Sequence, residues 1–196
     1  MKKTTIVICG LLAMAVLGFS GPKPPVDSKG DSPYKTLTKS DVAQLVKTGG
    51  FFSKCYDWNR EFCNPDGGFD NDFKAETLLG DKVVSDRAAG LMWHQDGSYK
   101  SLRFPDAQAW VRDLNRAGYA GFKDWRLPTL KEAATLLENR KFHGDLYIDP
   151  LFSRTQGWIW SGDICSSSGG WVVTFLGGAI ARPGYGLFFV RPVRTL

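Results

Sequence analysis

Hydrophobic residues recur at helical spacing on both sides of residues 125–129, which read WRLPT. Upstream, one helical face is formed at positions i, i+3, i+4 and i+7 by Ala107, Trp110, Val111 and Leu114. Pro105 suits the first turn of this helix, and Gly118 suits its end. Downstream, the same spacing returns at Leu130, Ala133, Ala134 and Leu137. The pattern therefore predicts two amphipathic helices, and the T-x-x-E capping box of Thr129 and Glu132 begins the second.

Alternating apolar positions predict short antiparallel strands before and after these helices. The expected strands are Lys82–Ser85, Leu91–His94, Trp158–Ser161, Trp171–Leu176, Ala179–Arg182 and Gly186–Arg194. Gly177 and Gly178 suit a hairpin turn. The expected fold class is α+β, with two main helices packed on a small, twisted antiparallel sheet with long loops. A further short helix is expected at Thr38–Lys47. It either docks on the core or contacts a partner.

The N-terminus has the pattern of a secretory signal. Lys2 and Lys3 precede the apolar run Ile6–Phe19, which ends in small residues, and cleavage is expected after Ser20. The run is shorter than the roughly 20 apolar residues of a comfortable membrane span, although a retained anchor is the alternative. We therefore expect an exported protein in the periplasm, at the cell surface or outside the cell, with no stable membrane span once the signal is removed.

Composition indicates the segments of the rest of the chain and limits the classes of partner that we expect. Residues 21–35 are rich in Pro, Gly, Ser and charge, which predicts a flexible linker; residues 36–72 form a helix and loop extension, and residues 73–196 form the main domain. Loss of Lys2 and Lys3 lowers the formal net charge from +5 to +3. No tract rich in Lys and Arg is present, so nucleic acid is not an expected partner.

The cysteines predict a disulfide. Cys55 and Cys63 are close in sequence, and an exported chain meets oxidising conditions. Pairing of either one with Cys165 is the alternative, because sequence alone does not settle connectivity. In the preferred pairing Cys165 is left over, as a buried thiol or as a link between two chains, so self-association is possible.

One acidic loop is the candidate metal site. Oxygen-bearing side chains gather near two glycines at Asp66, Asp70, Asn71 and Asp72, as calcium prefers. Their spacing is not that of an EF-hand loop, and a solvated acidic turn is the alternative. His94 and His143 have no zinc-ligand spacing. We therefore expect no cofactor, with calcium as the one possibility.

Several separated motifs resemble one known family. These are GLMW at Gly90–Trp93, WRLPT, WIWSGD at Trp158–Asp163, WVVTFLGG at Trp171–Gly178 and FFVRPVR at Phe188–Arg194. In this order they resemble the Lcl C-terminal domain, the C-terminal domain of the Legionella collagen-like adhesin, over roughly Phe73–Leu196. The motif residues expected to be structural are Trp93, Trp125, Arg126, Leu127, Pro128, Thr129 and Glu132. Arg126 is expected to anchor an acid such as Glu132 or Asp124.

The resemblance implies a C-type-lectin-like fold, which is distantly similar to the scaffold of the formylglycine-generating enzymes. Those enzymes hold copper with a pair of cysteines, whereas the matching region here contains only Cys165. No G-x-S-x-G nucleophile motif occurs either. The chain is therefore not expected to be an enzyme, and a copper oxidase is the least favoured alternative.

Recognition is the expected function, because loops on a rigid scaffold usually carry it. The expected binding loops are Gly162–Gly170 and Ala181–Gly186, and the residues expected to contact a glycan or a surface protein are Arg182, Tyr185, Trp158 and Trp160. Core packing is preferred for the other large rings Trp93, Trp110, Trp125 and Trp171. The E-P-N and Q-P-D sugar-binding tripeptides are absent. A structural subunit of a surface fibre or secreted assembly is the main alternative.

Overall fold

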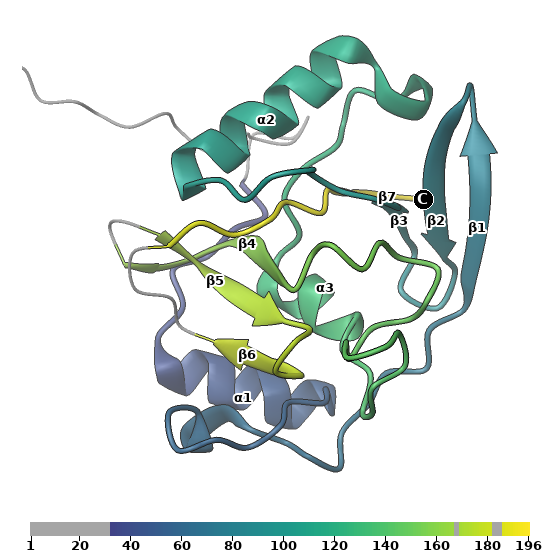
Figure 1. The fold of residues 1–196 in the computed structure, drawn as a ribbon. Helices are drawn as coiled ribbons and strands as arrows, with labels where there is room; N and C mark the ends of the chain where they lie inside the picture. The colour runs from purple at the N-terminus through teal and green to yellow at the C-terminus, as the bar shows by residue number, and fades with distance from the viewer. Residues whose placement is uncertain (1–31, 167–168, 182–185) are drawn as a thin grey trace, which may run out of the picture.

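The computed structural model describes residues 32–166, 169–181 and 186–196, and within them helices pack around two small antiparallel sheets (Figure 1). The helices are α1 (Lys39–Gly49), α2 (Phe104–Ala117) and α3 (Leu130–Thr135), with 3-10 turns η1 (Arg60–Phe62) and η2 (Tyr119–Gly121). One sheet has the order β1-β2-β3-β7, built from Phe73–Leu78, Asp81–Asp86, Leu91–His94 and Val193–Thr195. The other has the order β4-β5-β6, built from Trp158–Ser166, Gly169–Thr174 and Ala179–Ala181. The predicted α+β class is confirmed, with the sheet divided in two; the C-type-lectin-like fold stays a prediction.

Each sheet separates two hydrophobic clusters. Successive side chains of a strand point to opposite faces. In β5, Val173 therefore packs with α1 and α3, whereas its neighbour Val172 packs with α2. In β2, Val84 and Val83 divide in the same way. Figure 1 shows the result, with α2 and α1 on opposite sides of the strands.

The predicted helices form where their capping signals stand. Gly118 ends α2 in the left-handed conformation, at φ +71, as expected for a glycine after a helix. The Thr129–Glu132 capping box opens α3, which ends at Thr135, earlier than the apolar spacing suggested. The N-terminal helix begins after a second capping box, formed by Thr38 and Asp41.

Helix α1 is part of the core. Its two buried residues, Val42 and Val46, join the same cluster as α3 and β5. A short helix of this kind needs tertiary packing to persist. Docking on the core, rather than exposure to a partner, therefore describes the apolar face of the predicted N-terminal helix.

Two parts of the strand prediction are wrong. No sequence pattern indicated β1, because Phe73–Leu78 has no continuous apolar face. The last strand was expected at Gly186–Arg194, but only Val193–Thr195 pairs as a strand. Before it, the chain crosses from one sheet to the other through single bridges that join Phe188 to Leu102 and Phe189 to Ile159. A segment that changes sheets cannot keep one continuous ladder.

The end of the expected linker is fixed to the domain. The Tyr34 hydroxyl donates to the Leu127 carbonyl at 3.0 Å, and the Lys35 amide donates to Asp163 at 2.8 Å. The described part of residues 21–35 therefore packs against the WRLPT corner. The expected signal, residues 1–20, and most of the expected linker lie outside the described residues. None of the described helices is long and apolar enough to cross a membrane.

Candidate binding site

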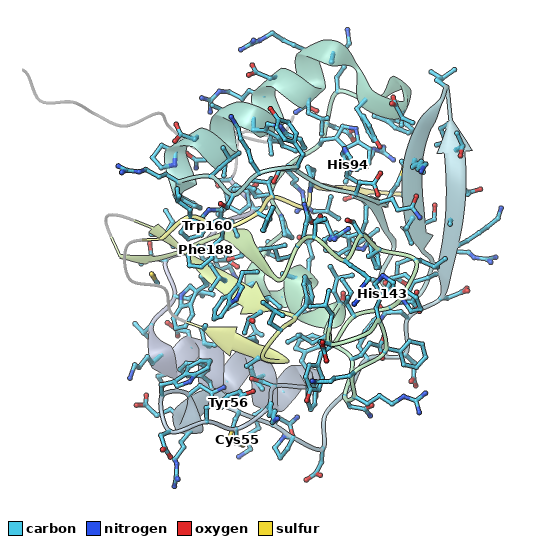
Figure 2. The ribbon with its side chains drawn as sticks, in the orientation of Figure 1. Cys55, Tyr56, His94, His143, Trp160 and Phe188 are labelled. Carbon is cyan, nitrogen blue, oxygen red and sulfur yellow. A yellow bond between two sulfur atoms is a disulfide. The ribbon has the colours of Figure 1, made fainter. Side chains whose placement is uncertain are left out.

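Of the four C-terminal residues expected to bind a ligand, two lie outside the described residues and two lie on β4. Arg182 and Tyr185 lie outside the described residues. Trp158 is half-buried against Phe188, with ring centroids 5.7 Å apart. Trp160 is only 2% exposed and packs edge-on against Phe188 at 4.7 Å (Figure 2). The expectation that Trp160 forms an exposed stacking surface is therefore wrong, because α2 covers this side of β4.

The WRLPT corner is a structural unit. Arg126 donates to both carboxylate oxygens of Glu132 at 2.7 Å, and Glu132 also accepts from the Thr129 amide. The Pro128 carbonyl accepts from the Gly162 amide at 2.7 Å. Three other motif residues are buried, as expected: Trp93, Trp125 and Leu127. Of the two acids expected as partners of Arg126, the structure gives Glu132, and Asp124 pairs with Arg194 instead.

Electrostatics agree with this role. Burial alone would raise the pKa of Glu132. The hydrogen bonds and the positive charge of Arg126, together with the hydrogen bonds of Thr129, outweigh burial, so the pKa of Glu132 is lowered. Burial likewise opposes the charge of Arg126, and Glu132 outweighs it by raising the pKa of the guanidinium. Both groups are charged at neutral pH and neutralise each other. This pair therefore offers no net charge to a ligand.

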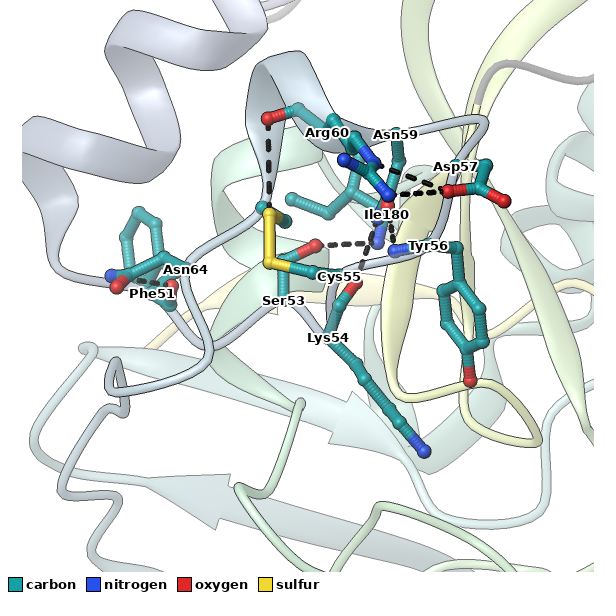
Figure 3. The surroundings of a disulfide bond; sticks show 11 residues. Phe51, Ser53, Lys54, Cys55, Tyr56, Asp57, Asn59, Arg60, Asn64 and Ile180 are labelled. Atoms are coloured by element: carbon teal, nitrogen blue, oxygen red, sulfur yellow. Dashed lines mark hydrogen bonds and ion pairs between the residues drawn. A yellow bond between two sulfur atoms is a disulfide. The ribbon is translucent and has the colours of Figure 1, made fainter.

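A disulfide shapes the loop that follows α1. Cys55 and Cys63 are bonded to each other, with their Cα atoms 5.0 Å apart, so the predicted pairing is confirmed and the alternatives with Cys165 are wrong. Inside the loop, the buried Asn59 side chain accepts from the Tyr56 amide at 2.7 Å and donates to the Lys54 carbonyl at 2.8 Å (Figure 3). The covalent bond and the internal hydrogen bonds together fix this loop in one shape.

Four side chains on and beside this loop form an exposed surface, here called the aromatic platform: Lys54, Tyr56, Trp58 and Tyr147. The rings of Tyr56 and Trp58 stack in parallel, with centroids 5.2 Å apart and planes 6° apart. Trp58 is 50% exposed, which is unusual for so large an apolar side chain. The Lys54 ammonium lies 5.5 Å from the Tyr56 ring and 5.8 Å from the Tyr147 ring. Figure 3 shows the Lys54 and Tyr56 side chains leaving the loop on the same side.

The platform is held from beneath. The Tyr56 hydroxyl donates to the Gly177 carbonyl at 2.8 Å, and the Tyr147 ring stacks on the buried Phe52 at 5.8 Å. Lys54 donates to the Tyr147 hydroxyl at 3.5 Å, and this contact raises the pKa of Lys54. The surface therefore presents the half-exposed Trp58 ring, stacked on Tyr56, beside the positive charge of Lys54. It needs little further ordering when a ligand binds.

Sequence reasoning missed this surface. The cysteines and acids are the conspicuous features of the loop, although Tyr56 and Trp58 have the period-two spacing that places side chains together. Tyr147 stands about ninety positions later, in a loop whose approach no local pattern reveals. The spacing of aromatics inside the disulfide loop was the one available signal.

Two of the four expected calcium ligands make other contacts. Asp72 pairs with Arg87 at 3.2 Å, and the Asn71 amide donates to the Thr135 carbonyl at 2.8 Å. Across the part of the chain that the structure describes, no three His, Cys, Asp or Glu side chains are grouped to hold a metal ion. The Cys165 thiol lies on β4, 3.4 Å from the Gly169 carbonyl. The geometry thus adds no support for calcium at Asp66 and Asp70, whose side chains are exposed.

Comparison with known protein families finds one whose model matches more than half of the sequence. Residues 82–194 match the Lcl C-terminal domain. The chain belongs to the Lcl C-terminal domain family. No match was found among curated proteins or among solved structures. The matched region includes Tyr147 but begins after Lys54, Tyr56 and Trp58, so this Lcl C-terminal domain chain builds its platform largely from residues that precede the match.

Loss of the disulfide is expected to destabilise the fold and loosen the platform. A disulfide that closes a loop of this length lowers the conformational entropy of the unfolded chain, which stabilises the fold by about 2.5 kcal/mol. We therefore expect the double variant Cys55→Ser, Cys63→Ser to lose about that much free energy of unfolding, measured by urea titration. Cys165→Ser is the control, because it keeps the disulfide and should still be destabilised by a reducing agent, to which the double variant should not respond. An unchanged midpoint in the double variant would contradict a stabilising role.

Proposed function

We propose that this chain is an exported, non-catalytic recognition module that binds a glycan at the cell surface or in the periplasm through the aromatic platform. The observation that carries the proposal is the half-exposed Trp58 ring, stacked on Tyr56 beside the Lys54 ammonium. Membership of the Lcl C-terminal domain family supports a surface adhesin-like role.

The chemistry of the platform suits a sugar. A pyranose has an apolar face of C–H groups, which packs on an indole or phenol ring, and hydroxyl groups around its edge, which need polar partners. The Trp58 ring, stacked on Tyr56, supplies the apolar face, and the Lys54 ammonium beside Tyr56 supplies a hydrogen-bond donor. Tyr and Trp also dominate the energy of protein interfaces, so a surface protein is the second ligand class for the same platform.

Export is supported by two features. The N-terminal pattern of Lys2 and Lys3 before Ile6–Phe19 is that of a secretory signal. The Cys55–Cys63 disulfide is of a kind that forms and persists in oxidising compartments.

The test is binding of the exported chain to immobilised neutral and sulfated glycans, with Trp58→Ala as the variant. Removal of a central aromatic contact is expected to weaken binding about tenfold. The free energy of unfolding should fall by about 1 kcal/mol, because the variant also loses the stack on Tyr56, and circular dichroism checks that it is folded.

Tyr99→Ala is the matched control. Tyr99 is 82% exposed and also lies beside a lysine, with Lys100 at 5.8 Å, but it stands between β3 and α2 rather than on the disulfide loop. We expect it to bind like the original chain. Equal losses of glycan affinity in the two variants would show that the platform is not the binding site. If no glycan binds saturably, the ligand is not a glycan, and a surface protein becomes the favoured ligand class.

A further inference from the structure

Strand β1 forms one edge of its sheet, and its outer side stands at the margin of the molecule (Figure 1). It pairs with β2 alone, from Phe73 opposite Asp86 to Leu78 opposite Asp81. Among the described residues, none forms a backbone hydrogen bond with its outer side. A strand edge with unpaired N–H and C=O groups is a template for another strand.

The residues whose backbone groups face outward follow from the ladder. In an antiparallel pair, hydrogen-bonded and non-bonded positions alternate. The Arg87 amide donates to the Asp72 carbonyl, which makes that position a bonded one. The Lys82 carbonyl accepts instead from Gln95 on the far side of β2, so the residue opposite Lys82 is turned away from β2. The outward-facing residues of β1 are therefore Phe73, Ala75 and Thr77.

These three positions are self-complementary about a two-fold axis. When β1 lies antiparallel to β1 of a second copy with Ala75 opposite Ala75, Phe73 of each copy lies opposite Thr77 of the other. All the residues so paired have their N–H and C=O groups turned toward the second strand, as a hydrogen-bonded ladder requires. Neither a shift by one residue nor a parallel pairing preserves this match.

The same register matches charge. It places Lys74 of each copy directly opposite Glu76 of the other, at the close spacing of cross-strand neighbours. These side chains now pair within one chain at 2.8 Å and are 60% and 30% exposed. Charged edge residues commonly discourage strand pairing. In this register, however, each cross-strand pair joins opposite charges, which favours pairing with a second copy.

Small side chains favour the approach. Ala75 stands at the centre of the paired segment and is exposed, as is Thr77. We propose that β1 is a dimerisation edge at which two copies of the chain pair antiparallel through residues 73–77 and join their four-stranded sheets. A dimer carries two aromatic platforms, which raises the avidity for a repeating surface without any new ligand contact. The pairing itself does not depend on the ligand.

The experiment exchanges the two charges in separate variants. In Lys74→Glu alone and in Glu76→Lys alone, each cross-strand pair joins like charges, and association is expected to weaken about tenfold. In an equimolar mixture, the introduced glutamate faces the introduced lysine, and the remaining Glu76 faces the remaining Lys74. The mixture should therefore form a dimer as strong as that of the original chain. Light scattering after size exclusion, over a concentration series, measures the mass.

A control variant separates the edge from general charge effects. Arg60→Glu reverses one member of the exposed Arg60–Asp57 pair on the disulfide loop, and should leave the dimer unchanged. Circular dichroism checks that each variant is folded. A monomeric original chain at all concentrations, a dimer insensitive to both charge exchanges, or a mixture that stays monomeric would each overturn the proposal.

Discussion

Replacing Arg126 by alanine is expected to cost about 3–5 kcal/mol of the free energy of unfolding, far more than the loss of an exposed ion pair. The guanidinium makes two 2.7 Å bonds to Glu132, and the two side chains are only 18% and 19% exposed. Removing one partner of such a pair leaves the other charge in a poorly hydrated place. Urea titration monitored by tryptophan fluorescence measures the loss.

This loss of stability is large because Glu132 also caps a helix. Its carboxylate also accepts from the Thr129 amide and so closes the capping box at the start of α3. Without Arg126, the carboxylate must either stay charged and unpaired or take up a proton and weaken the cap. Arg126→Lys should recover only part of the stability, because an ammonium cannot make the two parallel bonds of a guanidinium.

A control for this substitution stands on the surface. Arg116 pairs with Asp113 at 2.7 Å, but both side chains are largely exposed. Exposed ion pairs contribute little because water and salt screen them. Arg116→Ala should therefore change the free energy of unfolding by less than about 0.5 kcal/mol. A similarly small loss for Arg126→Ala would show that the WRLPT corner does not hold the fold together.

The parts of the fold that sequence predicted are those with local signals. Thr129 and Glu132 specify a helix start through contacts only three residues apart, and Gly118 specifies a helix end by itself. The missed strand β1 has no such signal. It is an edge strand with exposed residues on both faces, such as Lys74 and Ala75, so no alternation of apolar and polar positions marks it.

The binding surface was harder to predict for a related reason. Period two correctly placed Trp158 and Trp160 on one side of a strand, since both pack near Phe188. Sequence could not show that α2 would cover that side and bury Trp160. In the same way, Tyr56 and Trp58 become a platform only when Tyr147 and Gly177 approach from distant parts of the chain. Exposure is a property of the assembled fold rather than of a local pattern.

Acidification is expected to destabilise the protein through His94. The ring is buried, stacks on Tyr119 with centroids 4.1 Å apart, and accepts the Gly97 amide at Nδ1 (Figure 2). Burial, followed by the nearby positive charge of Arg191, lowers the pKa of His94 from 6.5 to about 4, although Asp96 and Asp81 act in the opposite direction. A proton at Nδ1 would also remove the acceptor of the Gly97 amide.

The sign of the effect follows from the two pKa values. Between pH 6.5 and 4 the unfolded chain binds a proton at His94 and the folded chain does not, so acid favours unfolding in this window. The contribution is absent above about pH 6.5. Its full size, from the difference in pKa, is about 3 kcal/mol near and below pH 4. The free energy of unfolding should therefore fall steadily as the pH is lowered through this range.

The difference between two proteins isolates this group from carboxyl groups such as Glu138 and Asp163, whose pKa values burial raises. His94→Gln keeps an acceptor for the Gly97 amide but takes up no proton, so its stability should change much less between pH 6.5 and 4. His143→Gln, which alters the only other histidine, is the matched control and should retain the slope of the original chain. Urea titrations at half-unit steps of pH measure all three slopes. Parallel slopes for the original chain and His94→Gln would show that another group carries the acid sensitivity, whereas a flattened slope in His94→Gln alone would show that burial of one uncharged imidazole between β3 and η2 sets it.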